Sequence, residues 1–262
     1  MNLNLTGKTA LVCGSTQGLG FATAKEIAML GANVILMARN ETKLKACLME
    51  LDQTKAQHHS YLVADFSNHQ AVQTAIESYL AAGTVIHILI NNTGGPAGGK
   101  AIDASIGAFS SAFESHLICN HILTQAVVPG MKAAGFGRII NVISTSVKQP
   151  LAGLGVSNTI RAAVANWSKT LATELGGFGI TVNNVLPGFT QTQRADYVIE
   201  KKAADAGIST DAVMKNLISE IPAGRIGQPE EFGAAVAFLC SPAAAYINGI
   251  NLPVDGGRTG CL

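Results

Sequence analysis

The chain has 262 residues, of which 48% are hydrophobic and 13% charged, so it can bury a large core. Its formal net charge of +1, without a basic stripe, argues against a nucleic-acid or acidic-membrane partner. No apolar run reaches the roughly 18 residues that span a bilayer, and the first residues lack a secretory signal pattern. The 5 cysteines are scattered and form no Cys-x-x-Cys pair, which is typical of reduced thiols and favours a cytoplasmic protein.

Along the chain, short β-rich apolar runs alternate with longer segments, such as Phe21–Leu30 and Ala71–Ala81, in which apolar residues recur every three or four positions. This alternation indicates parallel strands that are buried on both faces and joined by right-handed crossovers. It predicts an α/β fold, a Rossmann-type doubly wound parallel sheet of seven strands. The predicted strands are Thr9–Cys13, Asn33–Met37, Ser60–Val63, Ile86–Ile90, Arg138–Ile143, Thr181–Leu186 and Gly249–Val254.

One long segment, residues 189–222, contains no strand pattern but has two helical pieces, Ala195–Ala206 and Asp211–Ser219. Long segments of this kind in a compact domain are often functional, so we predict a lid over a ligand. No linker rich in proline, serine or charge divides the chain, and we expect residues 1–262 to form a single domain.

A glycine-rich turn joins the first predicted strand to the first predicted helix. Glycines let the backbone turn tightly and approach a pyrophosphate, and the start of a helix offers free N–H donors. We therefore predict that a dinucleotide binds at this turn. The residues expected to contact it are Gly14, Ser15, Gln17, Gly18, Leu19 and Gly20.

The second predicted strand runs into Arg39 and Asn40. An acidic residue at this place would accept hydrogen bonds from the adenosine ribose and favour NAD(H), whereas an arginine can hold a 2′-phosphate. No acid stands there, so the sequence favours NADP(H) over NAD(H). Gln17 adds no second positive charge to this preference.

Motifs in the expected order make the chain similar to the short-chain dehydrogenase/reductase family over essentially all 262 residues. Among its members, the chain most resembles the 3-oxoacyl-[acyl-carrier-protein] reductases. The resemblance implies that Asp65 meets the adenine, that Asn92 lies along the cofactor, and that Pro187, Gly188 and Thr192 lie beside the nicotinamide. The motifs are Gly14-x3-Gly18-x-Gly20, Ala64-Asp65-Phe66-Ser67, Asn91-Asn92-Thr93-Gly94, Pro187-Gly188 with Thr192, Arg225-Ile-Gly-Gln-Pro-Glu-Glu and Val254-Asp255-Gly256-Gly257.

The catalytic positions depart from the family pattern. The family uses an asparagine, a serine, a tyrosine and a lysine. At the matching spacings this chain has His116, Ser144, Ser157 and Arg161, so only the serine is retained. In the family, the tyrosine gives the proton to the developing alkoxide, and the lysine lowers the tyrosine's pKa and binds the nicotinamide ribose. Ser157 is a far weaker acid, and Arg161 is a poor proton relay although it can bind ribose hydroxyls.

Several residues are candidates to replace the missing acid. His116 is expected to titrate near neutral pH and to protonate an alkoxide directly or through water. Lys148 follows Ser144 by four residues and is expected above the site. Ser144 itself can donate a hydrogen bond to a carbonyl oxygen. Tyr197 and the pair Lys201-Lys202 lie in the predicted lid, where closure would bring one of them inward.

The leading hypothesis is an NADP-dependent oxidoreductase that reduces a carbonyl or oxidises an alcohol, with an altered proton donor. The alternative is a catalytically impaired dinucleotide-binding sensor or oligomer partner, which the pair Ser157 and Arg161 favours. The family resemblance implies a homotetramer, in which the helices around Ile102–Met131 and Val156–Leu175 pack against a second subunit. The remaining histidines have no ligand-like spacing with cysteine or acid, so we expect no metal site.

Overall fold

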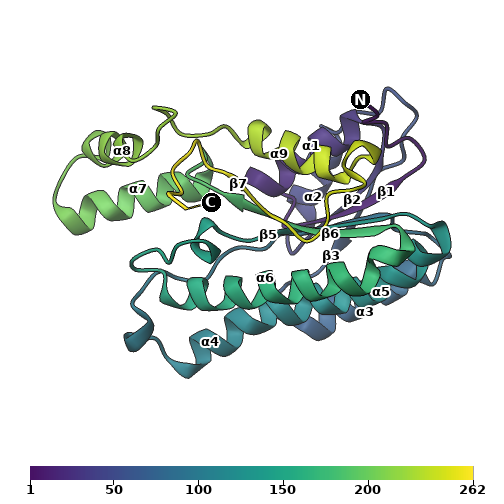
Figure 1. Ribbon diagram of the computed structural model, residues 1–262, viewed down its shortest axis with the longest axis horizontal. Coiled ribbons are helices and arrows are strands. Elements are labelled where there is room, and N and C mark those ends of the chain that lie inside the picture. The colour runs from purple at the N-terminus through teal and green to yellow at the C-terminus, as the bar shows by residue number, and fades with distance from the viewer. Residues whose placement is uncertain (262) are drawn as a thin grey trace.

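The structure is a computed structural model that describes residues 1–261. It contains a 7-stranded parallel sheet with the strand order β3-β2-β1-β4-β5-β6-β7 (Figure 1). The prediction of a doubly wound parallel α/β sheet is therefore confirmed. β4 and β7 each begin two residues later than predicted. The strands are β1 (Thr9–Cys13), β2 (Asn33–Ala38), β3 (Ser60–Val63), β4 (Ile88–Asn91), β5 (Gly137–Val142), β6 (Ile180–Pro187) and β7 (Asn251–Val254).

Helices cover both faces of the sheet. Figure 1 shows α1, α2 and α9 on one face and α3, α5 and α6 on the other. None of the helices within residues 1–261 has the length and hydropathy needed to cross a membrane. The helices are α1 (Gly18–Met29), α2 (Glu41–Leu48), α3 (His69–Leu80), α4 (Ile106–Phe113), α5 (Cys119–Ala134), α6 (Gly155–Leu175), α7 (Gln193–Ala206), α8 (Thr210–Ser219) and α9 (Pro229–Cys240).

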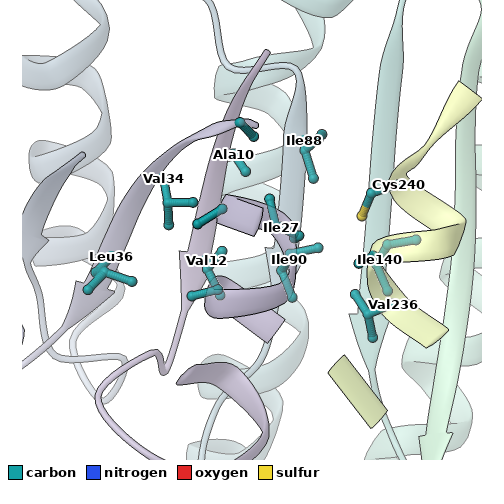
Figure 2. Packing of buried hydrophobic residues seen from close by; sticks show 14 of the residues in the cluster. Ala10, Val12, Ile27, Val34, Leu36, Ile88, Ile90, Ile140, Val236 and Cys240 are labelled. Carbon is teal, nitrogen blue, oxygen red and sulfur yellow. The ribbon is translucent and has the colours of Figure 1, made fainter. Parts of the chain in front are cut away.

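Two hydrophobic cores, one on each face, hold the layers together. Side chains alternate along each strand, so neighbouring residues of β1 contribute to opposite faces: Val12 packs in the core beneath α1 and α9, whereas Leu11 packs in the core beneath α3, α5 and α6. Burial of each large aliphatic side chain stabilises the fold by about 1.5–3 kcal/mol. Figure 2 shows the first core, with labelled side chains Ala10, Val12, Ile27, Val34, Leu36, Ile88, Ile90, Ile140, Val236 and Cys240.

Four asparagines form a ladder across β4, β5, β6 and β7. They stand in register, and each carboxamide donates to the next: Asn91 to Asn141 at 2.8 Å, Asn141 to Asn184 at 3.0 Å and Asn184 to Asn251 at 2.8 Å. Hydrogen bonds of this kind let polar side chains be buried inside the sheet. The ladder fixes the relative positions of these four strands, from which site residues extend on β4, β5 and β6.

The predicted lid forms two helices, as the sequence indicated. α7 and α8 follow the carboxyl end of β6 and project beyond the sheet (Figure 1). They pack on each other through a small core of their own, made of Ile199, Ala203, Val213 and Leu217. Thr192 begins α7 by accepting a hydrogen bond from the N–H of Ala195 at 3.2 Å. The segment thus has few ties to the main core, which suits an element that moves.

Candidate functional site

Two glycines of the glycine-rich turn, Gly14 and Gly20, are packed too closely to accept a side chain. A Cβ on Gly20 would lie 2.2 Å from the carbonyl oxygen of Gly14, and a Cβ on Gly14 would lie 2.6 Å from the carbonyl oxygen of Asn92. The Asn92 side chain donates to the carbonyls of Cys13 and Gly14, each at 3.2 Å. The turn is therefore held rigidly against the end of β4. It presents the N-terminus of α1, whose free N–H groups and dipole suit a pyrophosphate.

The other predicted residues of the turn differ in what they offer a cofactor. The hydroxyl of Ser15 is buried and accepts a hydrogen bond from the N–H of Met37 at 3.0 Å, so Ser15 ties the turn to β2 and would meet a cofactor through its backbone. Gln17 is exposed at the start of α1, and its side chain makes no capping hydrogen bond. Leu19 is half-buried. Gly18 faces the lid, since a Cβ on it would lie 3.4 Å from Cγ2 of Thr192.

The structure brings Arg39 and Asp65 together at the end of β2. Nη1 of Arg39 lies 3.8 Å from Oδ2 of Asp65, and both side chains are exposed. Hydrogen bonds from Ser67 lower the pKa of Asp65 against the opposing effect of burial, with a smaller contribution from Arg39. Asn40 uses its side-chain oxygen to cap α2, accepting from the N–H of Lys43 at 2.9 Å. Arg39 is therefore an exposed cation at the predicted adenosine end of the site.

The predicted nicotinamide end is fixed by β7. The N–H of Gly188 donates to the carbonyl of Val254 at 2.9 Å, directly after Pro187 ends β6. Asp255, which follows β7, accepts from the N–H groups of Gly257 at 3.0 Å and Thr259 at 2.8 Å. The C-terminal motif therefore braces the chain from which Thr192 and the lid depart.

Arg161 reaches from α6 to the end of β5. Its Nη1 donates to the carbonyl oxygen of Val142 at 3.0 Å, and its side chain is only 7% exposed. Ser157, one helical turn earlier, is half-buried. Ser144 follows β5 and accepts a hydrogen bond from the N–H of Ser146 at 3.1 Å, which leaves its own hydroxyl hydrogen available as a donor. Lys148 is half-buried in the loop after Ser144.

His116 lies in a π-helical turn, Glu114–Ile118, between α4 and α5. Such turns widen a helix and are frequent at functional sites. The His116 ring is buried, and its Nδ1 lies 2.6 Å from the hydroxyl oxygen of Thr93. Burial, followed by the positive charges of Arg161 and Arg194, lowers the pKa of His116 to about 3. The prediction that His116 titrates near neutral pH is therefore wrong, and its ring is neutral at pH 7.

This neutral ring predicts a pH effect on stability. Between pH 6.5 and about 3, the unfolded chain binds a proton at His116 that the folded chain does not, so the free energy of unfolding falls as the pH drops through this range. The contribution has a slope of up to about 1.4 kcal/mol per pH unit. We expect His116→Asn to flatten the slope in urea unfolding between pH 7 and pH 4.5. The exposed His58→Asn should not change it; equal slopes for His116→Asn and the unmodified chain would contradict the neutral ring.

Arg194 is a residue of the site that sequence reasoning missed. It lies in the first turn of α7, and its Nη1 and Nη2 donate to the carbonyls of Gly95 and Pro96, each at 3.4 Å. Its charge acts on both His116 and Arg161. The only signal in the sequence was its position two residues after Thr192. Among residues 1–261, no three side chains of histidine, cysteine, aspartate or glutamate gather as metal ligands.

Comparison with known proteins agrees with this arrangement. A family model described as "Enoyl-(Acyl carrier protein) reductase" matches residues 14–259. The 3-oxoacyl-[acyl-carrier-protein] reductase FabG of Vibrio cholerae is 32% identical over 256 residues, which cover 97% of this chain and 98% of that protein. A tropinone reductase homolog of Arabidopsis thaliana, At1g07440, is 34% identical over 260 residues, 98% of this chain and 92% of that protein.

A solved structure gives the same result. The L-sorbose reductase of Gluconobacter frateurii, complexed with NADPH and L-sorbose, has a TM-score of 0.93 and 30% identity, and the match covers 100% of both chains. The glycine turn, the strand order and the sequence motifs after β4, β6 and β7 are therefore features of one protein family. The chain belongs to the short-chain dehydrogenase/reductase family of NAD(P)-dependent oxidoreductases that act on carbonyls and alcohols.

Proposed function

We propose that the protein reduces a carbonyl with NADPH, or oxidises the corresponding alcohol, in the manner of a 3-oxoacyl-thioester reductase with an altered proton donor. The observation that carries this proposal is the joint position of Ser144 and Arg161. Ser144 follows β5, and Arg161 binds the carbonyl of Val142 at the end of the same strand; Gly18 of the glycine turn faces Thr192 at the start of α7. A scaffold that only binds a dinucleotide has less need of these groups.

The residues fit the cofactor. Side chains at Gly14 and Gly20 would clash with the backbone, so these glycines keep the turn tight and its N–H groups accessible, and Arg39 is exposed at the predicted adenosine end. Asp65 and Asn92 would flank the adenosine and the middle of the dinucleotide, and Pro187, Gly188 and Thr192 the nicotinamide. When bound, the reduced nicotinamide supplies a hydride to the carbonyl carbon. Arg161 would donate to the nicotinamide ribose hydroxyls.

The proton must reach the alkoxide oxygen by another route than a phenol. Ser144 would donate a hydrogen bond to the carbonyl oxygen and so stabilise the charge that develops on it. A neutral His116 can donate or accept a hydrogen bond but offers no imidazolium proton. We infer that the proton comes from Lys148 or from water held by Ser144, because these groups lie in the loop directly after β5.

The experiment that tests the proposal is a screen of cofactor oxidation. NADPH and NADH are each offered with ketones, aldehydes and 3-oxoacyl thioesters, and the loss of reduced nicotinamide is followed by absorbance. We expect slow turnover with NADPH on at least one carbonyl class. The alternative is a dinucleotide-binding sensor or oligomer partner, favoured by Ser157 at the tyrosine position. NADPH binding in calorimetry without turnover on any substrate would support that alternative.

Cofactor preference depends on Arg39. Replacing Arg39 with aspartate should shift the preference from NADPH towards NADH, because the 2′-phosphate loses a charge-assisted contact worth about 1.5–3 kcal/mol. Calorimetric titration of both cofactors measures the change. Lys43→Met, which removes a cation from the neighbouring helix α2, is the matched control and should keep the preference for NADPH. Equal affinity of the unmodified protein for the two cofactors would contradict the assignment.

We also propose a homotetramer with closed two-fold symmetry. Ile102, just before α4, is 90% exposed, and Ile106, the first residue of α4, is 87% exposed. Exposure of two large apolar side chains this close together is unfavourable for a lone chain in water. A hollow of about 490 Å³ lies between α4, the π-helical turn and α6, and is lined by Phe109, Ser110, Phe113, Glu114, Ile118 and Ile160. Sedimentation at micromolar concentration should give a tetramer, and Ile102→Lys with Ile106→Lys should give smaller species. A monomeric unmodified protein would contradict the assembly.

A further inference from the structure

Arg161 is a buried cation whose hydrogen-bonding capacity is largely unused. Arg138 is similarly buried but satisfies its guanidinium: it donates to the carbonyls of Ser241, Gly137 and Gly179 and lies 4.2 Å from the ring centroid of Phe136. Arg161 donates one hydrogen bond, to the carbonyl of Val142. Burying a charge is costly unless it is paired. A guanidinium has five N–H donors, so after Val142 and the two ribose hydroxyls proposed above Arg161 still has donors for a further acceptor.

A second guanidinium faces the same place. Both side chains reach Gly95: a Cβ built on this glycine would lie 3.3 Å from Nη2 of Arg194 and 3.8 Å from Nη2 of Arg161. No carboxylate within residues 1–261 forms an ion pair with either arginine. Two like charges that converge without an acid repel each other, and a bound anion would relieve this repulsion. His116 beside them is neutral, so it does not supply a counter-charge.

We propose that the substrate is an oxo acid, or the corresponding hydroxy acid, whose carboxylate binds between Arg161 and Arg194 while Ser144 holds its carbonyl or hydroxyl. This inference rests on the proposed reductase function, because it names the substrate of the same site: a free acid in place of a thioester. Arginine suits the task, since its planar donors match a carboxylate. The reaction is balanced: the hydride of NADPH forms the new C–H bond, the carbonyl π electrons move to oxygen, and the oxygen takes one proton.

Arg194 also gives the lid a role in recognition. It lies in the first turn of α7, and the two carbonyls it contacts, of Gly95 and Pro96, belong to the loop after β4. These contacts are long, so they can yield to the stronger bond with a carboxylate. Binding of an acid would therefore hold α7 over the site. The start of α7 already lies near the glycine-rich turn, because Gly18 faces Thr192.

Matched acids and esters test the proposal without requiring turnover. Protein loaded with oxidised NADP is titrated in a calorimeter with 2-oxobutanoate, 3-oxobutanoate and 4-oxopentanoate, and with the methyl ester of each. We expect at least one acid to bind about 10-fold or more tightly than its ester. Arg194→Met should weaken the binding of that acid by about 10- to 100-fold, which is the loss expected for a hydrogen bond to a charged group. The affinity for the ester should not change. Arg194→Lys should retain part of the acid preference.

The control is Lys215→Met, which removes an exposed cation from the neighbouring helix α8 and should keep the preference for acids. Equal affinities for acids and esters would overturn the proposal. So would an Arg194→Met variant that binds NADPH more weakly and loses affinity for acid and ester alike. Acid binding that depends on Arg194 but gives no turnover with NADPH would preserve the carboxylate site between Arg161 and Arg194 and contradict the reductase function, so the two failures are distinguishable.

Discussion

Replacing Ser157 with tyrosine and Arg161 with lysine is expected to raise the rate of carbonyl reduction by about 10²–10⁴-fold, the usual contribution of a positioned general acid. The two residues lie one turn apart on α6, and Arg161 already reaches the end of β5. In the proposed mechanism, a phenol at position 157 would donate its proton to the carbonyl oxygen beside Ser144, and a lysine at 161 would lower the pKa of that phenol. Turnover with NADPH on the most active carbonyl of the screen measures the change.

The control for this double substitution is Ser157→Phe with Arg161→Lys, which has nearly the same bulk without the hydroxyl. If the tyrosine and phenylalanine forms were equally active, the account of the missing acid would be wrong. A gain with tyrosine alone would mean that the site still aligns hydride donor and carbonyl, and that only the proton donor has been lost.

Ser144→Ala is expected to lower kcat by about 10²–10³-fold, because one hydrogen bond to the developing alkoxide is lost. NADPH affinity should be unchanged, since the glycine turn and Arg39 are not altered. Ser146→Ala is the matched control: it lies in the same short turn, and its buried hydroxyl has no hydrogen-bond partner in the structure. Thermal unfolding checks that loss of the Ser144 cap leaves the protein folded. A kcat within a few fold of the unmodified protein would remove Ser144 from the mechanism.

Local patterns in the sequence were sufficient for the fold. All seven strands were predicted close to their observed bounds, and the two helices of segment 189–222 were found within three residues of their ends. These elements carry their own signals: buried strands are continuous apolar runs, and Thr192 is a good N-cap residue. The glycine turn was also recognised, because its conformation depends on residues that are adjacent in the chain.

Contacts between distant segments were not predictable in the same way. The asparagine ladder needs the register of four strands, which no single segment defines. The low pKa of His116 comes from burial in a π-helical turn and from two arginines far away in the chain. Arg194 meets Gly95 only because the lid folds back over the loop after β4. Tertiary packing therefore lowers the pKa of His116, which the sequence alone had placed near neutral pH.

The central claim, that this site transfers hydride without a tyrosine, is tested most directly by isotope transfer. The unmodified protein is incubated with a carbonyl substrate and NADPH that carries two deuterium atoms at C4 of the nicotinamide, and the alcohol is examined by mass spectrometry. We expect one deuterium on the carbinol carbon of each product molecule. In Ser144→Ala the label should still be transferred, but more slowly. Bound NADPH with no deuterated alcohol from any substrate in the panel would contradict the central claim.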